Sequence, residues 1–188
     1  MRSKAGVLLL AAAFVSCHVK NVDDTAVESP TLVQQQMLDE GWTFVSPRED
    51  LTKDYGIEPA YGIQDNYFDI AIGKGCSVAI KIMDLQTNRC IRYVYVAEDS
   101  EITVHEIPQG QYYLKLAYGS DWMEMDANGG KLGKFTKSVS YAKSTDLFDF
   151  GIKNSSEVAN YRLEINIVDS QLEYNFTSTP ISEEEFMK

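Results

Sequence analysis

Three cysteines carry the most reactive side chains of the sequence, and they stand in two kinds of surroundings. Cys17 ends the apolar stretch "AAAFVSC", whereas Cys76 and Cys90 open the segments "CSVAIKIM" and "CIRYVYVA". A cysteine sulfur can attack an electrophile, ligate a metal or form a disulfide, and the last two need a second group within reach. The neighbours of each cysteine therefore decide its chemistry.

The segments that begin at Cys76 and Cys90 are interpreted as strands joined by "DLQTNR", which predicts an antiparallel hairpin with Asp84 facing Arg89. The predicted cross-strand pairs are Ile82 with Ile91, Ile80 with Tyr93, and Val78 with Tyr95. In that register the two cysteines lie roughly 20 Å apart along the sheet, whereas a disulfide needs Cα atoms within about 7 Å. We expect two buried free thiols, with neither an intrachain disulfide nor a two-cysteine metal site.

Histidine is scarce, since the sequence has only His18, beside Cys17, and His105. A Ser-His-Asp arrangement would have His105 alone as its base, and a zinc site with several histidines lacks its ligands. The alternation of "EITVHE" places His105 on the polar face of a strand. Asp and Glu are abundant, but no pair stands at a spacing that marks catalytic carboxylates. We therefore do not expect enzymatic activity, and we assign no catalytic, cofactor-binding or metal-ligating residues.

The stretch "DWMEMDANGG" contains oxygen ligands beside a glycine, the combination that a calcium loop requires. The candidate ligand residues are Asp121, Asp126, Asn128 and Gly129. Their order lacks the regular alternation of ligands and the distal bidentate Glu of an EF-hand. We therefore favour a solvated hairpin loop and expect no calcium cofactor.

Trp122, Tyr113 and Tyr118 are the aromatic residues that could form an exposed binding surface. Aromatic rings stack on sugars and anchor protein partners. Trp122 follows Gly119 into an expected loop, where binding residues are often placed. The alternation of its strand directs the Tyr118 side chain toward the core, so packing in the core is an equal alternative to binding for this residue. These three are the candidate ligand or partner residues.

The N-terminus has the features of an export signal. Arg2 and Lys4 form a short positive region, and residues 5–15 form an apolar run that ends in small residues. This run is shorter than the roughly 20 apolar residues that a membrane-spanning helix needs. We predict that residues 1–16 are a signal peptide and that the protein is exported without an integral span.

Ser16 followed directly by Cys17 resembles the lipobox of bacterial lipoproteins, although Phe14 stands where that pattern prefers Leu. The resemblance implies cleavage before Cys17 and a diacylglycerol on its sulfur, together with an acyl chain. Two or three lipid chains hold a protein at a membrane, whereas one binds reversibly. We expect a protein anchored through Cys17 to the outer membrane, on its periplasmic or cell-surface face. The alternative is an ordinary signal peptide with an incidental cysteine.

The exported chain would be strongly acidic. The full sequence has 17 Lys and Arg against 28 Asp and Glu, and its formal net charge of −11 becomes −13 when residues 1–16 are removed. Binding to nucleic acid depends on Lys and Arg that neutralise phosphates, so nucleic acid is not an expected partner. The charge favours cationic partners instead.

Residues 17–64 are interpreted as a lipidated N-terminus and tether. Within them, "SPTLVQQQMLDEGW" predicts a short helix that begins near Ser29, has Pro30 in its first position and ends at Gly41. The following segment is rich in turn residues but contains aromatic side chains, which are rare in disordered chains. Part of the tether is therefore expected to pack on the domain.

Residues 65–188 are interpreted as one β-sandwich domain. From Tyr67 onward, apolar and polar side chains alternate in nine short segments separated by Gly, Asn, Asp and Pro. This pattern predicts an all-β fold, an antiparallel β-sandwich of about seven to nine strands. The final "ISEEEFMK" has Ser182 and Glu185 at the spacing of a capping box, which predicts a last helical turn that docks Phe186.

The stretch "ITVHEIPQGQYYLKLAYG" combines a tight turn with an alternating strand. Pro108 and Gly110 mark the turn, and Tyr112, Leu114 and Leu116 point to one face of the strand after it. The pattern I-P-x-G-x-Y-x-L after a hairpin resembles transthyretin-like, or carboxypeptidase-regulatory-like, β-sandwich domains. The resemblance covers residues 67–118 and implies architecture only, since it carries no catalytic residues.

Three functions fit these observations. The first is a lipid-anchored cell-envelope protein whose non-catalytic sandwich binds or organises a protein partner. The second is a carbohydrate-binding module of a surface glycan system, suggested by the aromatic residues. The third is an inhibitor or immunity factor against a basic hydrolase, which the acidic charge would steer toward the protein.

Overall fold

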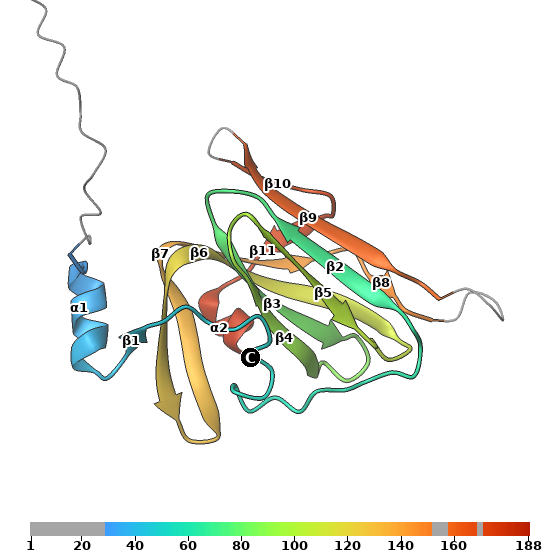
Figure 1. Ribbon diagram of the computed structural model, residues 1–188, viewed down its shortest axis with the longest axis horizontal. Coiled ribbons are helices and arrows are strands. Elements are labelled where there is room, and N and C mark those ends of the chain that lie inside the picture. The colour runs from blue at the N-terminus through green and yellow to red at the C-terminus, as the bar shows by residue number, and fades with distance from the viewer. Residues whose placement is uncertain (1–28, 152–157, 169–170) are drawn as a thin grey trace, which may run out of the picture.

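The computed structural model describes residues 29–151, 158–168 and 171–188. The expected signal peptide and the lipobox at Cys17 lie outside these described residues. Eleven strands and two helices are seen, which confirms an all-β architecture (Figure 1).

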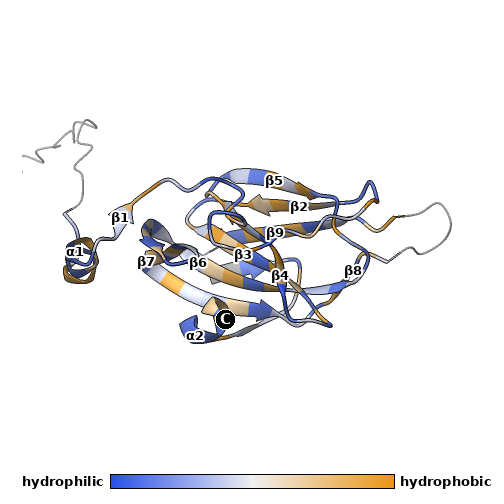
Figure 2. Cartoon of the chain, turned by 90° about the horizontal axis from the view of Figure 1, so that it is seen from below, coloured by the Kyte–Doolittle hydropathy of each residue, from blue (hydrophilic) through white to orange (hydrophobic). Residues whose placement is uncertain are grey.

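Two sheets stack to form a sandwich, with β2, β5 and β9 in one layer and β3, β4 and β6 in the other (Figure 2). The four-stranded sheet has the order β10 (Gln171–Tyr174), β9 (Tyr161–Val168), β2 (Tyr67–Ile72) and β5 (Ser100–His105). The seven-stranded sheet has the order β11 (Ser178–Pro180), β7 (Gly130–Ser144), β6 (Gln111–Ala127), β3 (Ser77–Asp84) and β4 (Cys90–Val96). Two short strands, β1 (Thr43–Phe44) and β8 (Phe148–Asp149), also pair with β6. The strand β2 pairs parallel with β9, so the smaller sheet is mixed rather than purely antiparallel.

A hydrophobic core between the two sheets confirms the sandwich. The apolar residues of the alternating segments form this core. Tyr112, Leu114 and Leu116 of β6 all belong to this core, as their parity predicts. The Tyr112 hydroxyl donates to the Pro108 carbonyl at 3.0 Å, which ties the strand to the turn before it. The turn is closed further by Asn66, whose side chain bonds both the N–H and the C=O of Ile107 at 2.8 Å.

A second apolar cluster lies on the outer face of the seven-stranded sheet. It consists of Leu51, Ala79, Tyr93, Ala117, Trp122, Phe135 and Phe186. Residues 49–57 and the helix α2 (Glu183–Met187) contribute to it, so the segment before β2 packs on the domain and α2 covers the side of β6 and β7 that faces away from β2 and β5 (Figure 2). This sheet is therefore buried on both faces.

The helix α2 confirms the prediction for the C-terminus. The Ser182 hydroxyl accepts from the Glu185 N–H at 3.1 Å, and Phe186 is buried. Two lysines of the sheet reach its last carbonyls, because Lys81 Nζ donates to Phe186 O at 2.8 Å and Lys115 Nζ donates to Glu185 O at 2.7 Å. Cations are favourable at the negative end of a helix dipole. The two lysine side chains therefore stabilise α2 in its position together with the buried Phe186 ring.

The first helix, α1 (Leu32–Asp39), starts two residues later than the sequence predicts. Thr31 and Gln34 form a capping box, with the Gln34 N–H donating to Thr31 Oγ1 at 3.2 Å and the Thr31 N–H donating to Gln34 Oε1 at 2.8 Å. This reciprocal bonding satisfies two free N–H groups, which fixes the start at Thr31 rather than Ser29. Gly41, at φ 96°, follows the end of the helix as predicted.

The predicted register of the β3–β4 hairpin is wrong by one residue over most of its length. Met83 faces Cys90, as expected, but a β-bulge follows, and Ile82 faces Arg92 rather than Ile91. The other corrected pairs are Ile80 with Val94 and Val78 with Val96. Since a one-residue slip turns every side chain to the other face, Val94 and Val96 enter the inner core while Tyr93 joins the outer cluster.

Candidate functional site

The expected exposed aromatic surface is absent, because Trp122, Tyr113 and Tyr118 are all buried. The strand β6 does not end near Gly119 but shifts register there and continues with β7 to a turn at Asn128 and Gly129. This bulge lets a long hairpin replace the expected loop. Trp122 consequently packs edge-on against Phe135, with ring centroids 4.8 Å apart, inside the outer cluster. The three residues therefore supply core packing, and they form no binding surface.

Trp122 also belongs to a buried polar group centred on Glu124. The Glu124 carboxylate accepts from Tyr55 Oη at 2.9 Å, from Trp122 Nε1 at 3.1 Å and from Lys131 Nζ at 2.8 Å. Burial, followed by the hydrogen bond to Glu124, raises the pKa of Tyr55 well above its usual value. Because the carboxylate has three donors, this group ties residue 55 to the β6–β7 hairpin and has no need of a ligand.

Cys76 and Cys90 are free thiols. Burial raises the pKa of Cys90 to about 11, and its Sγ donates to the Arg92 carbonyl at 3.1 Å. Burial also raises the pKa of Cys76. A protonated thiol is a poor nucleophile, so both cysteines behave as small apolar residues.

The calcium candidates are spread along the hairpin. Asp121 lies at the register shift of β6, where its carboxylate accepts from Gln34 Nε2 at 3.1 Å. Asp126 lies five positions further along the strand, about 16 Å away at the rise of a β-strand, and Asn128 and Gly129 form the turn. The hairpin therefore separates Asp121 from the other candidate ligands.

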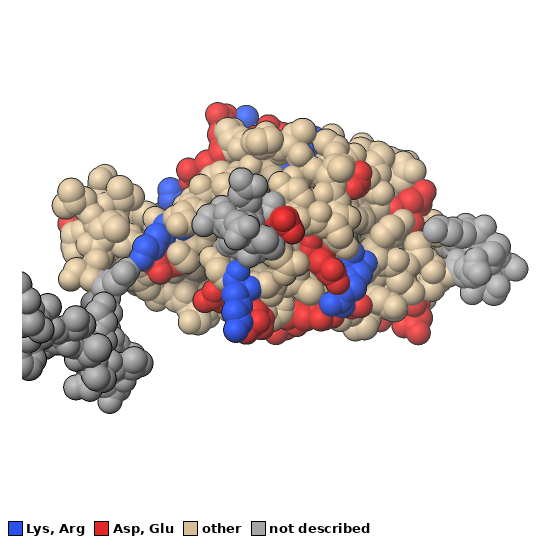
Figure 3. Space-filling model, turned by 90° about the horizontal axis from the view of Figure 1, so that it is seen from above, with Lys and Arg blue, Asp and Glu red and all other residues tan. Residues whose placement is uncertain are grey.

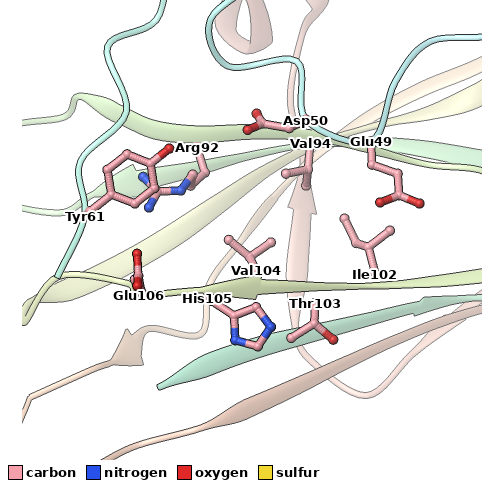
Figure 4. Close-up of a pocket in the computed structure, with 10 residues that line it drawn as sticks. All are labelled: Glu49, Asp50, Tyr61, Arg92, Val94, Ile102, Thr103, Val104, His105 and Glu106. Atoms are coloured by element: carbon pink, nitrogen blue, oxygen red, sulfur yellow. The ribbon is translucent and has the colours of Figure 1, made fainter. Parts of the chain in front are cut away.

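A candidate site is a pocket of about 220 Å³ between β4 and β5, the neighbouring edge strands of the two sheets (Figure 4). Its apolar floor is formed by Val94, Ile102 and Val104. Its polar wall is formed by Glu49, Asp50, Tyr61, Arg92, Thr103, His105 and Glu106. An apolar floor with a few convergent polar groups is the usual composition of a binding site.

Arg92 is the most unusual residue of the pocket, because only 3% of it is exposed and one of its donors is unused. Its Nη1 donates to the carbonyls of Ile91, at 2.9 Å, and Ala60. Its Nη2 is buried and has no hydrogen-bond partner within the described part of the chain. Burial is the largest influence on its pKa, which lies below the usual arginine value. A buried donor without an acceptor is costly, so this nitrogen is suited to an incoming acceptor.

Tyr61 covers the Arg92 guanidinium. The guanidinium carbon lies 3.9 Å from the centroid of the Tyr61 ring, and Figure 4 shows the two groups stacked with Glu106 beside them. Tyr61 is 56% exposed, so its ring stands at the mouth of the pocket.

The charge around the pocket is mainly negative. Glu49, Asp50 and Glu106 are exposed carboxylates, and Arg92 carries the single guanidinium among the residues that line the pocket. On the molecular face drawn in Figure 3, acidic side chains occupy many places and basic ones occupy fewer. The local charge of the site therefore has the sign of the whole protein, and it favours a ligand with positive groups.

Sequence reasoning missed Arg92 because it placed this residue opposite Lys81, on the outer face. The bulge places Arg92 opposite Ile82, so its side chain points between the sheets. A lone arginine in the apolar run "CIRYVYV" is the signal that could have identified it, since a buried charge needs partners. His105 is exposed on β5, as predicted, but it also borders the pocket.

No family model, curated protein or solved structure matches the chain. Among the described residues, none of the helices has the length and apolar character to cross a membrane.

Proposed function

We propose that the protein is a lipid-anchored cell-envelope protein, exported and held through Cys17, whose non-catalytic sandwich binds a protein partner. The observation that carries the binding role is the pocket between β4 and β5, with its apolar floor, acidic wall and unused Arg92 donor. The apolar run that ends at Cys17 supports the anchor.

The size of the pocket supports a macromolecular partner rather than a small ligand. Small-molecule sites usually occupy about 300–1,000 Å³, whereas this pocket has about 220 Å³. Such a volume suits one or two side chains of a larger partner.

Site-specific photo-crosslinking tests the binding role in cells. A photoreactive residue in place of His105 should capture one discrete protein, while the same residue in place of Glu173, on β10 at the other edge of the sheet, should not. Both positions are exposed. Equal labelling from the two positions, or none from His105, would contradict a partner at this pocket.

Metabolic labelling with palmitate tests the anchor separately. The full chain should be labelled and should fractionate with membranes, and Cys17→Ala should be unlabelled and released. Cys90→Ala is the matched control and should stay labelled. A wild-type chain that is soluble and unlabelled would contradict the lipid anchor.

A carbohydrate ligand is the second candidate, and the exposed Tyr61 ring favours it. Aromatic rings beside carboxylates commonly stack on sugars, and Tyr61 stands at the pocket mouth next to Glu106. A glycan array that shows binding lost in Tyr61→Ala would support this candidate, and an array without binding would remove it.

A further inference from the structure

The strand β5 is an unpaired edge of the four-stranded sheet. It pairs with β2 on one side, and no other strand of the described residues pairs with it on the other. Natural proteins usually protect such edges with lysine, proline or bulges. The strand "SEITVH" contains neither residue, and its one acidic side chain, Glu101, is paired with Arg162 at 2.6 Å. The edge is thus accessible to another strand.

The hydrogen-bonding groups of Thr103 and His105 point toward this free edge. The Glu106 N–H donates to Asn66 O, which starts the alternation of the β2–β5 ladder, while the Tyr67 and Gly73 N–H groups point to the opposite side of β2. Because bonded and non-bonded pairs alternate in an antiparallel ladder, the main-chain N–H and C=O groups of residues 103 and 105 face away from β2. No strand of the residues that the structure describes takes these groups, so an added strand can pair with them.

The pocket runs along this edge. Five consecutive residues, 102–106, line it, although successive side chains of a strand point to opposite faces. What these residues share is the backbone edge of β5. On the other side of the pocket, Glu49 and Asp50 belong to a segment that already pairs with β4. The pocket is therefore a groove between an open strand edge and an acidic wall.

From these observations we infer that the partner of the proposed function binds by strand addition, laying an extended basic segment along the free edge of β5. Its backbone pairs with Thr103 and His105, its basic side chains lie near Glu49, Asp50 and Glu106, and an acceptor of the segment takes the free Arg92 Nη2. This inference rests on the proposed function and names the partner's chemistry. Backbone pairing supplies the affinity in this mode of binding, and side chains supply the specificity.

The probes are capped octapeptides labelled with fluorescein. In the first, Val and Lys alternate, so that all lysines lie on one face of the extended chain. The matched control alternates Val and Glu. A third peptide has the Val/Lys sequence with N-methyl groups on alternate residues, which removes the N–H groups of one edge. Binding to the full chain is measured by fluorescence anisotropy.

Strand addition predicts that the Val/Lys peptide binds and that the Val/Glu peptide binds about tenfold more weakly or not at all. N-methylation should weaken the Val/Lys peptide by about tenfold, because it removes main-chain hydrogen bonds. Equal affinity of the N-methylated and unmodified peptides, or of the two charge forms, would overturn the inference.

A pair of variants tests the same claim from the protein side. Thr103→Pro removes an N–H that faces away from β2, and Thr103→Ala loses only the side chain. The proline variant should lose about tenfold in affinity for the Val/Lys peptide while the alanine variant stays within about twofold. Equal binding by the two folded variants would overturn strand addition. If Thr103→Pro fails to fold, the N-methylated peptide decides.

These outcomes separate the two proposals. If His105 crosslinks a protein but neither N-methylation nor Thr103→Pro weakens the peptide, the partner role stands and strand addition is wrong. If His105 captures nothing, the partner role itself fails, whatever the peptides do.

Discussion

Two neighbouring strand edges of this sandwich differ in how they are finished. The chain covers the edge of β4 itself, because the Leu51 N–H donates to Tyr93 O at 2.9 Å and the Tyr95 N–H donates to Glu49 O at 2.8 Å. The edge of β5, across the pocket, has no such strand among the described residues. We call these the sealed edge and the open edge.

The difference separates stability from binding. At the sealed edge, Leu51 and Thr52 are buried, and Thr52 Oγ1 accepts from the Tyr93 N–H at 3.0 Å. At the open edge, Thr103 and His105 are exposed. Changes at the sealed edge should therefore reduce the free energy of unfolding, whereas changes at the open edge should act on a ligand.

The largest expected effect comes from breaking the sealed edge at Leu51. Leu51→Ala leaves a cavity in the outer cluster and should lower the free energy of unfolding by about 2–5 kcal/mol. Urea denaturation measures this loss. Leu32→Ala, which changes a side chain that is 92% exposed, is the matched control and should cost less than about 0.5 kcal/mol. Equal costs for the two variants would contradict the seal.

A smaller effect is expected from Tyr55, which fastens the segment that follows the sealed edge. Tyr55→Phe removes one of three donors to the buried Glu124 carboxylate and should cost about 1–3 kcal/mol. Tyr67→Phe, at a ring that is 39% exposed, should be nearly neutral in the same denaturation experiment. A neutral Tyr55→Phe would show that Glu124 does not need this bond.

The cysteine on the sealed side offers a dependence on pH. The pKa of Cys90 is raised to about 11 by burial, so its protonated form contributes stability below the ordinary thiol pKa of about 8.5. This contribution is lost as the pH rises toward the folded value. In Cys90→Ala, the melting temperature should fall less steeply with rising pH over this alkaline range than in the wild type. Thermal melts from neutral to alkaline pH measure this dependence. An unchanged slope would contradict the burial of the thiol.

The smallest effect on stability is expected at the open edge. Thr103→Pro removes an N–H that β2 does not use, and edge strands tolerate proline at such positions. It also removes the Thr103 Oγ1–Asp69 hydrogen bond of 2.7 Å, so the proper reference is Thr103→Ala, which lacks it too. The free energies of unfolding of the two variants, measured by urea denaturation, should agree within about 1 kcal/mol. A much larger loss of unfolding free energy in the proline variant would show that the Thr103 N–H is hydrogen-bonded to β2, which contradicts an open edge.

Short-range patterns predicted the elements of the sandwich well. Alternation located β2, β5 and β9, and the capping spacing at Ser182 predicted α2 with Phe186 docked. These features depend on residues only a few positions apart in the sequence. Periodicity and capping patterns involve residues at the same short separations, so they predict such features.

The candidate site was not predicted, because it depends on irregularities and distant contacts. One bulge in β4, between Cys90 and Arg92, turned Arg92 inward, and another near Gly119 buried Trp122 within a longer hairpin. The sealing of β4 by residues 49–51 joins segments about 40 positions apart in the chain. A bulge inserts one extra residue into a strand, and no strong sequence pattern announces it. Alternation of polarity therefore does not predict which face of the sheet the side chains beyond a bulge occupy.

Amide hydrogen exchange gives the most direct test of the open edge. In the free protein, the N–H groups of Thr103 and His105 should exchange quickly, while those of Leu51 and Tyr95 at the sealed edge should be protected. The Val/Lys peptide should slow exchange at Thr103 and His105 and leave the sealed edge unchanged. Protection of Thr103 and His105 in the free protein, or no change there when the peptide binds, would contradict an open edge that receives a partner strand.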